Sequence, residues 1–576
     1  MKKKSLWLLG MLIAMMLFVV ACGNDDDASS SKDNGDTSSE TTDGENTEGG
    51  EGCEEPTTFH FFDASGPGED LNTAETKLGQ MFEEDTCVNF NVEHIVGDVN
   101  QKIGTMIASG EYPHLLNAEQ STDAVIDAGG FIPLNDLLEE HAPNIMKWYG
   151  PYLEYMKRDD GNIYLISSGA NQGYIKPPNI HQGGWWLKRD VLKELGFPHP
   201  KTLDDYFDII EEYVSANPQI DGANTIGFTS LTDDWRFFAL SNQPNHLAGY
   251  PNDGGIMVDM ETHEVNVYGN KPETERWLKK LNEVNDKGLV DQEMFTQNYD
   301  EYLAKLATGR VVGFFDYQWQ VADAFNSIRE SEDFYSEYMA FPIVFEEGIK
   351  DQYLDPDGFV ASPGMGITVN TTEEERVQII KFLDYLAQEE IQKMITWGIE
   401  GETYSVDENG EYYQTQEQYD ETSKTAFREE FGFTTFEWGW PRINGVYEDG
   451  NSVEPRNQPS VAAMAYNDVD KEFLEAYGIE TFAELFSEPD ERPWFPAWDT
   501  PIETGSQAQL YEQQLDDLMK RKYPELIFAS PSDFDSQWNS YTEEFEKLPY
   551  EEYEAVIEES VKRKFDIAEK AAENAE

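Results

Sequence analysis

Aromatic rings stand beside carboxylates in two short stretches, TSLTDDWRFF (residues 229–238) and FFDYQWQ (residues 314–320). A flat ring can stack on an apolar face of an organic ligand, while carboxylates and amides accept hydrogen bonds from its hydroxyl groups. Both stretches follow runs typical of strands, so the rings should lie just beyond strand ends. We expect Trp235 to contact a ligand, with a core position under a loop as the alternative. Alternation along a strand would put Tyr317 and Trp319 on one face, and we expect one of them to line the site unless both face the core.

Arg236 directly follows Trp235 and carries the positive charge of this stretch. Its guanidinium could pair with a carboxylate on a ligand. The neighbouring Asp233 and Asp234 offer a simpler partner, and we expect an ion pair with a nearby aspartate.

Polar residues follow two further strand-like runs. Asp63 ends TTFHFFD, and Glu119 and Gln120 follow HLLNA. In doubly wound sheets, ligands bind beyond the carboxyl ends of the strands. Asp63, Glu119 and Gln120 are therefore candidate ligand contacts, although Asp63 could instead cap the turn that follows it.

Two loops later in the chain add weaker candidates. In WGIEGETY (residues 397–404), Gly398 can stop the preceding helix in the left-handed conformation. Glu400 then either contacts a ligand or takes the backbone amides of a structural turn. In FEWGWPR (residues 436–442), Trp440 lies beside a proline that suggests a rigid loop, and we include it among the ligand-binding candidates.

The charge of the chain and the motifs that its sequence lacks argue against several functions. The chain carries 113 acidic and 41 basic residues, a formal charge of −72, so it is not expected to bind nucleic acid by neutralising phosphates. There is no nucleophile elbow, no HExxH and no phosphate-binding loop. The acidic turns DPDG and DENG fall short of a calcium loop. We expect no cofactor, no metal site and no catalytic residue.

The elements around these candidates alternate in type. A strand-like TTFHFF, a helix-like run and a strand-like VNFNVEHI open the body, which predicts a parallel sheet covered by helices. Cys53 and Cys87 stand just before these two strands. If the strands are neighbours, both cysteines lie at one edge, where a disulfide can form, and two free thiols are the alternative.

The N-terminus has the features of an export signal. Three lysines precede an apolar run that ends at Ala21, and that run is too short to span a bilayer. Ala21-Cys22-Gly23 resembles a bacterial lipobox, which implies removal of residues 1–21 and a lipid on Cys22. Residues 22–53 are small, polar and acidic, and should form a disordered tether.

Several motifs, taken in order, resemble one protein family. They are MIASGEYPHLLNAE (106–119), WLKRDVLKELGFPHPKTLDDY (186–206), GRVVGFFDYQWQVADAF (309–325), WGIEGETY, and SPSDFDSQWNSYTEEFEKLPYEEYEAVI (530–557). Together they resemble the sugar-binding class of extracellular solute-binding proteins, in particular a large lipoprotein subgroup of Gram-positive bacteria. His114 departs from the aspartate usual in the first motif.

The resemblance implies an α/β fold of the periplasmic-binding-protein type II, with two lobes joined by crossover strands. Lobe 1 would comprise residues 54–170 and 341–396, lobe 2 residues 171–340 and 397–560, and residues 561–576 a frayed helix. The implied role is capture of an oligosaccharide for an ABC importer by a monomer anchored outside the cell membrane, with the permease subunits as partners. A secreted glycoside hydrolase and a surface adhesin or wall-binding lipoprotein remain alternatives.

Overall fold

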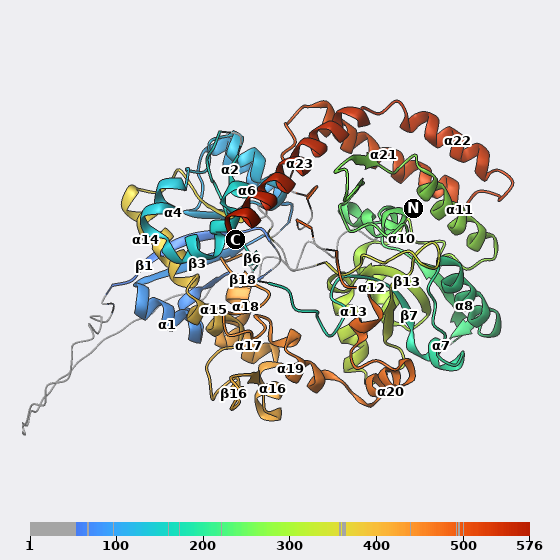
Figure 1. The fold of residues 1–576 in the computed structure, drawn as a ribbon, viewed down its shortest axis with the longest axis horizontal. Helices are drawn as coiled ribbons and strands as arrows, with labels where there is room; N and C mark the ends of the chain where they lie inside the picture. Colours follow the sequence, from blue (N-terminus) through green and yellow to red (C-terminus); the bar gives the residue numbers. More distant parts are fainter. Residues whose placement is uncertain are drawn as a thin grey trace, which may run out of the picture. The chain divides into compact units, whose positions relative to one another are not determined.

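Two larger β-sheets, each with its own hydrophobic core, organise the described part of the chain (Figure 1). The computed structural model describes residues 53 and 55–575, apart from 66, 67, 96, 159, 172, 221, 356–358, 360–363, 438, 491, 494, 495 and 499. Residues 52–576 form one unit. The signal segment 1–21, Cys22 and the tether up to residue 52 lie outside the described residues.

The first sheet has the strand order β2-β3-β1-β4-β15-β5. Its strands are β1 (Thr57–Asp63), β2 (Leu71–Asn72), β3 (Val88–His94), β4 (Leu115–Asn117), β5 (Ile166–Ser167) and β15 (Gly364–Ile367). β1 is parallel to β3 and β4, as the alternation of strands and helices predicts. β15 comes from far along the chain and pairs antiparallel with β4 and β5, so the sheet is mixed.

Amphipathic helices pack against this sheet and against one another. They are α1 (Lys77–Thr86), α2 (Val99–Ser109), α3 (Thr122–Asp127), α4 (Asn135–His141), α5 (Pro143–Tyr149), α6 (Leu153–Met156), α14 (Glu373–Leu386) and α15 (Glu389–Thr396). α14 starts at a capping box formed by Thr372 and Glu375. Asp384 ties α14 to α5 by accepting hydrogen bonds from the backbone N–H groups of Asn144 and Ile145, at 2.7 and 2.8 Å.

A disulfide joins Cys53 to Cys87, with their Cα atoms 5.3 Å apart. Thr57 and Val88 are partners in the register of β1 and β3, so the residues before these two strands lie at the same end of the sheet. Cys87 also ends α1 in the left-handed conformation, with φ of 58°. The bridge therefore fastens the start of the described body to the α1–β3 turn.

The second sheet has the strand order β10-β13-β7-β14. Its strands are β7 (Gly183–Lys188), β10 (Ile226–Thr229), β13 (Val311–Tyr317) and β14 (Tyr338–Phe341). β10 and β13 are parallel, whereas β7 is antiparallel to β13 and β14. Every residue of β7 and β13 is buried, which means that both faces of the sheet are covered.

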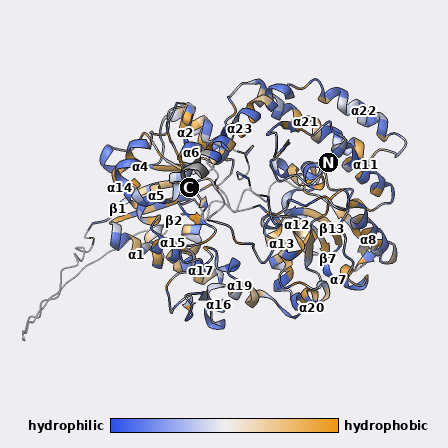
Figure 2. Cartoon of the chain, viewed as in Figure 1, coloured by the Kyte–Doolittle hydropathy of each residue, from blue (hydrophilic) through white to orange (hydrophobic). Residues whose placement is uncertain are grey.

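The helices of the second core are α7 (Arg189–Glu194), α8 (Leu203–Ala216), α9 (Phe238–Ser241), α10 (Gln243–Leu247), α11 (Pro272–Asp286), α12 (Tyr299–Ala307) and α13 (Gln318–Glu330). Figure 2 shows that helices such as α8 and α11 carry both hydrophilic and hydrophobic residues, as expected for helices with one buried face. Two antiparallel pairs accompany them, β8 (Gln219–Ile220) with β9 (Ala223–Asn224), and β11 (Ile256–Val258) with β12 (Val265–Val267).

The chain folds back onto the first core after α15. This return contains β16 (Ser405–Val406), β17 (Tyr412–Tyr413), α16 (Gln416–Thr422), α17 (Thr425–Phe431), α18 (Phe433–Glu437), β18 (Ile443–Asn444) and α19 (Pro459–Ala462). β18 pairs in parallel with β6 (Ala170–Asn171). The indole N–H of Trp397 donates to the backbone oxygen of Ser452 at 2.9 Å, and its ring packs against Tyr404 and Tyr412.

The two cores therefore divide the chain differently from the expected lobe boundaries. Core residues between 397 and 461 belong to the first sheet, not to the second. Phe341, Ile343, Phe345, Tyr353 and Leu354 belong to the second core, although 341–396 was expected in lobe 1. The cause is long-range packing, because the aromatic residues of each stretch meet ring partners from distant parts of the chain.

The C-terminal helices pack on the second core. They are α20 (Asp468–Tyr477), α21 (Gln507–Ile527), α22 (Phe534–Phe545) and α23 (Tyr550–Ala575), and α21 contacts α11, α22 and α23. α23 also reaches α6, where the Tyr155 hydroxyl donates to the backbone oxygen of Lys564 at 3.0 Å. Val561 is fully buried, so the first part of segment 561–576 is packed.

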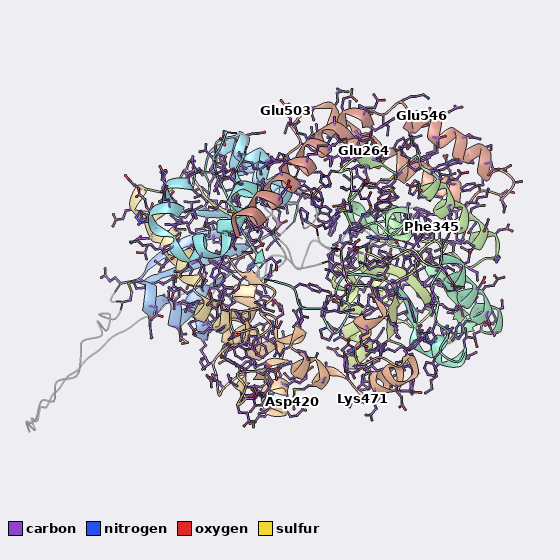
Figure 3. All side chains as sticks on the ribbon, viewed as in Figure 1. Glu264, Phe345, Asp420, Lys471, Glu503 and Glu546 are labelled. Carbon is purple, nitrogen blue, oxygen red and sulfur yellow. A yellow bond between two sulfur atoms is a disulfide. The ribbon has the colours of Figure 1, made fainter. Side chains whose placement is uncertain are left out.

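Acidic residues lie on the outside of many elements. Figure 3 labels four exposed ones from different parts of the chain, Glu264, Asp420, Glu503 and Glu546. Among the described helices, none combines the length and apolar character that a membrane span requires.

Candidate functional site

Two tryptophans form an exposed stack beyond the carboxyl ends of β10 and β13. Because these strands are parallel neighbours, the residues that follow them meet at one edge of the sheet. Trp235 lies in the short helix Asp234–Phe237 after β10, and Trp319 lies in the first turn of α13 after β13. Their ring centroids are 6.0 Å apart, their planes differ by 8°, and each residue is 52% exposed. We call this pair the tryptophan platform.

One partly buried ring and one buried ring support the platform. Phe238 stacks on Trp235 at 5.8 Å, and Tyr317 lies 6.0 Å from Trp319. Tyr317 is 8% exposed, and its hydroxyl lies 3.3 Å from Nε2 of His246, which is also buried. The platform therefore rests on side chains that are themselves held in place.

Tyr317 and Trp319 do not share one face of a strand. β13 ends at Tyr317, and Trp319 belongs to the helix that follows. The change from strand to helix cancels the alternation, so Tyr317 packs inward while Trp319 is exposed. Of the two candidates, Trp319 is the one at the surface.

Arg236 lies between two aromatic rings. Its guanidinium carbon is 4.6 Å from the centroid of Trp235 and 4.1 Å from that of Tyr299. None of the ion pairs found among the described residues includes Arg236, so the expected pairing with an aspartate is not formed. Asp233 instead accepts a hydrogen bond from the backbone N–H of Tyr299 at 3.0 Å.

A polar cluster lies at the corresponding edge of the first sheet. Asp63 ends β1 and Asn117 ends the parallel strand β4. The Asn117 side-chain amide donates to Oδ1 of Asp63 at 3.0 Å, and Oδ1 of Asn117 accepts from the backbone N–H of Glu119 at 3.2 Å. Ser65 N–H also donates to Asp63, at 2.9 Å. The candidate Gln120 is exposed beside this cluster.

Glu119 has an unusual environment for a glutamate. Burial raises the pKa of Glu119 to about 7, and the nearby charge of Asp63 adds to the increase while the hydrogen bond with Asn117 opposes it. Its backbone is in the left-handed region, with φ of 48°. The carboxyl group can therefore either accept or donate a hydrogen bond near neutral pH.

Gly439 approaches Asp63 closely from the other side. A Cβ atom at this position would lie 2.4 Å from Oδ2 of Asp63, and the φ of Gly439 is 76°. Only glycine fits such a contact without displacing the Asp63 carboxylate, and it also adopts this positive φ without strain. Asp63 is 4% exposed in this arrangement.

Glu400 lies in a self-contained turn. Gly398 has φ of 88°, and the Thr403 hydroxyl donates to the Trp397 carbonyl at 2.7 Å and accepts from the Ile399 N–H at 2.8 Å. Glu400 itself is exposed and bridges by its backbone to Tyr404. The glycine stop and the polar turn that the sequence indicates are both present, and none of the described contacts links Glu400 to the two strand edges.

Trp440 is part of the first core. It is 2% exposed, its ring meets Phe61 at 5.1 Å and Phe90 at 5.3 Å edge to face, and its N–H donates to the Thr435 backbone oxygen at 2.9 Å. In this arrangement its ring has no free face.

The sequence-based candidates thus separate into three groups. They are the tryptophan platform with the supporting Tyr317, the Asp63–Glu119 edge with Gln120, and the two residues outside both sites, Glu400 and Trp440.

Sequence reasoning missed two members of these sites. Asn117 links Asp63 to Glu119, and its position as the last residue of the LLN strand is a signal that could have found it. His246 supports Tyr317 from α10, which no local pattern indicates. Within the described residues, no three His, Cys, Asp or Glu side chains are grouped as metal ligands would be.

Two α/β lobes with polar and aromatic side chains at strand ends define the class of two-lobed periplasmic binding proteins. Comparisons of this chain with known protein families and solved structures give the same class. A sequence model of the bacterial extracellular solute-binding protein family matches residues 77–414, more than half of the chain. The chain belongs to this family. Members of the family bind solutes and are not enzymes.

Three curated relatives show how far the similarity extends. They are the fructooligosaccharide ABC transporter substrate-binding protein FusA of Streptococcus pneumoniae (28% identical, over 44% of this chain and 48% of FusA), lipoprotein LipO of Bacillus subtilis (21%, 61% and 67%), and the polygalacturonan/rhamnogalacturonan-binding protein YtcQ of Bacillus subtilis (22%, 55% and 61%). The chain thus spans 48% of the length of FusA in the sequence alignment. The solved structure of FusA with kestose superposes with a TM-score of 0.61 at 20% identity, covering 88% of this chain and 99% of FusA. That likeness establishes the α/β periplasmic-binding-protein fold.

Proposed function

We propose that this protein is the substrate-binding lipoprotein of an ABC importer, capturing an oligosaccharide in a cleft between its lobes and delivering it to the membrane permease. The observation that carries the proposal is the tryptophan platform. Two rings that are each 52% exposed and nearly parallel offer a surface for the apolar faces of sugar rings. Exposed aromatic pairs of this kind are typical of binding sites.

The polar edge of the first sheet supplies the complementary chemistry. Glu119 can accept hydrogen bonds from hydroxyl groups, and the exposed Gln120 can both donate and accept. In open α/β sheets, ligands bind beyond the carboxyl ends of the strands, where both clusters lie. We therefore assign Trp235, Trp319, Glu119 and Gln120 as ligand contacts, with Asp63 positioning Glu119 through Asn117.

Two relatives carry names that support a carbohydrate ligand. FusA is a fructooligosaccharide ABC transporter substrate-binding protein, and YtcQ binds polygalacturonan or rhamnogalacturonan. These names differ in the sugar, so the ligand class is the level at which they support the proposal. The name of LipO supports a lipid anchor, which we place on Cys22 at the outer face of the cell membrane.

The lobes that we propose follow the two cores. The first lobe takes residues 59–170 and 359–461, and the second takes 180–354 and 473–561. The short stretches between these ranges would be the crossover segments that bend when the lobes close. We expect a monomer that presents its closed form to the permease subunits.

A panel of oligosaccharides tests the proposal. Binding to the folded state must raise the melting temperature, and small-angle scattering should show compaction with the same sugar. Chromatography should recover that sugar unchanged. Release of reducing ends would instead indicate a glycoside hydrolase. Capture of a polymer or a host protein, without any response to short sugars, would indicate an adhesin or wall-binding protein.

A further inference from the structure

We propose that the ligand of the tryptophan platform carries a carboxylate, as uronate-containing oligosaccharides do, and that Arg236 recognises it. This inference rests on the proposed function, because it names the chemistry of the sugar bound at the same site. Arg236 would act as a specificity-determining residue beside the stacking rings.

The first observation is the position of the guanidinium group. Its central carbon lies 4.6 Å from the centroid of Trp235, so Arg236 stacks directly against one half of the platform. Tyr299 holds it from the other side at 4.1 Å. Contacts with two aromatic rings restrict the orientation of the group. Unlike Nε, its two terminal nitrogens are not among the buried atoms without a partner in the described part of the chain.

The second observation concerns hydrogen bonds. A guanidinium group has five N–H donors. Nε of Arg236 is buried and has no acceptor within the described residues. A buried polar group without a partner requires an explanation, because its desolvation is not offset. A ligand carboxylate that binds in the plane of the group would meet its two terminal nitrogens, which are not among these buried atoms, and would supply acceptors for both at once.

The third observation is that two nearby carboxylates accept hydrogen bonds from other groups. Asp233 accepts from the backbone of Tyr299. Asp316 accepts from Tyr302 at 2.8 Å, from Gln320 at 2.7 Å and from the backbone N–H of Tyr317 at 2.8 Å. Burial raises the pKa of Asp316 and the charge of Arg236 opposes that increase, but among the described residues Arg236 forms no ion pair, in a chain with 113 acidic residues and 41 basic ones.

Arg276 provides a matched comparison within the same lobe. It also lies over an aromatic ring, that of Phe345 (labelled in Figure 3) at 4.5 Å. Unlike Arg236, it is bound in the protein by Glu346 at 3.0 Å and by the backbone oxygen of Phe345 at 2.9 Å. An arginine that only supports an aromatic ring thus finds protein acceptors in this fold, which sets Arg236 apart.

The test compares two series of sugars with the full-length chain lacking its signal peptide. One series contains uronate tetramers, such as tetragalacturonate, and the other contains neutral tetramers, such as galactotetraose. Arg236→Met removes the charge but keeps an apolar stem against the rings, and Arg276→Met is the control. Thermal shift identifies the binding sugars, and calorimetry at two salt concentrations measures their affinities.

We expect at least one uronate tetramer to raise the melting temperature and to bind about 10- to 100-fold more weakly to Arg236→Met, the range for a hydrogen-bonded charged group. Added salt should weaken that binding in the unmodified protein more than in this variant. Arg276→Met should bind as the unmodified protein does.

Two results would overturn the inference while leaving the proposed function intact. One is stabilisation by neutral tetramers with none by uronates, and the other is unchanged uronate affinity in a folded Arg236→Met. A protein that responds to neither series would overturn the proposed function itself, and this inference with it.

Discussion

Replacing Trp235 with alanine is the most direct perturbation of the proposed site. The side chain is 52% exposed, so its removal should leave the core intact. Within the protein it meets Phe238 at 5.8 Å, Trp319 at 6.0 Å and Arg236 at 4.6 Å. Aromatic pairs contribute about 0.5–1.5 kcal/mol each, and exposed cation–π contacts about 0.5–1 kcal/mol. Because such terms are not additive, we expect Trp235→Ala to lower the free energy of unfolding by about 1–3 kcal/mol.

The effect on ligand affinity should be of similar size but separable from stability. Loss of a stacking ring should weaken binding of the best oligosaccharide by about 1–3 kcal/mol. Since about 1.4 kcal/mol corresponds to a tenfold change in Kd, the expected loss is roughly 5- to 150-fold. Isothermal calorimetry below the melting temperature measures it on the folded variant. Trp235→Phe keeps a smaller ring and should recover part of the affinity.

Tyr413→Ala is the matched control, because Tyr413 is an exposed aromatic residue on β17, which is outside both strand edges. It should leave the affinity unchanged. Our reasoning would be refuted if Trp235→Ala were folded and bound the sugar as tightly as the unmodified protein. Equal losses in Trp235→Ala and Tyr413→Ala would also refute it, since the effect would then not be local to the platform.

Three further changes test the fold and the first-sheet edge. Replacing Cys53 and Cys87 with serine should lower the free energy of unfolding by about 3–4 kcal/mol, because the bridge spans a sequence separation of 34 residues. Unfolding by guanidinium measures this difference, and an unfolding curve that coincides with that of the oxidised, unmodified protein would contradict the prediction. Arg492→Met should lower the free energy of unfolding by about 3–5 kcal/mol, because the Arg492 and Asp253 side chains are 3% and 1% exposed and 2.7 Å apart, so the change leaves the Asp253 charge buried without its partner. Adding Asp253→Asn should recover part of the lost stability in urea unfolding, and no recovery would argue against a buried-charge penalty. Burial raises the pKa of Glu119 to about 7, above its unfolded value of roughly 4.3, so the folded state binds more protons between these pH values and loses stability as pH rises through them. Glu119→Gln lacks this contribution, so its stability relative to the unmodified protein should increase from pH 4.5 to 7, and a constant difference would be inconsistent with the raised pKa.

Local patterns were sufficient for much of the fold. The strands β1 and β3 carry apolar residues among polar ones, each follows a cysteine closely, and their parallel pairing follows from the intervening helix. The position of Cys53 and Cys87 before these strands made a bridge geometrically reasonable, and the two sulfurs are joined. The strand ends also predicted where Trp235 and Glu119 would lie, because a residue just beyond a strand must come to the sheet edge.

Properties that depend on distant partners could not be predicted in this way. Trp440 resembles the exposed tryptophans in sequence context, and only Phe61 and Phe90, from strands more than 300 positions earlier, decide that it is buried. Segment 397–461 joins the first core through contacts such as that of Trp397 with Ser452. The missing ion pair of Arg236 likewise depends on Tyr299, whose backbone engages Asp233 and whose ring holds the guanidinium.

The two strand edges also share a backbone feature that bears on how a ligand is bound. Glu119 and Asp234 both have left-handed backbones, with φ of 48° and 50°, although neither is glycine. Such conformations cost about 1–3 kcal/mol each and persist only where surrounding contacts impose them. At Glu119 the Asn117 side chain holds the turn, and beside Asp234 the Asp233 carboxylate is fixed by the Tyr299 N–H. At the proposed site, contacts within the protein thus hold both edges, so binding of the proposed ligand would not have to order these loops, and more of the interaction energy would remain for affinity and lobe closure.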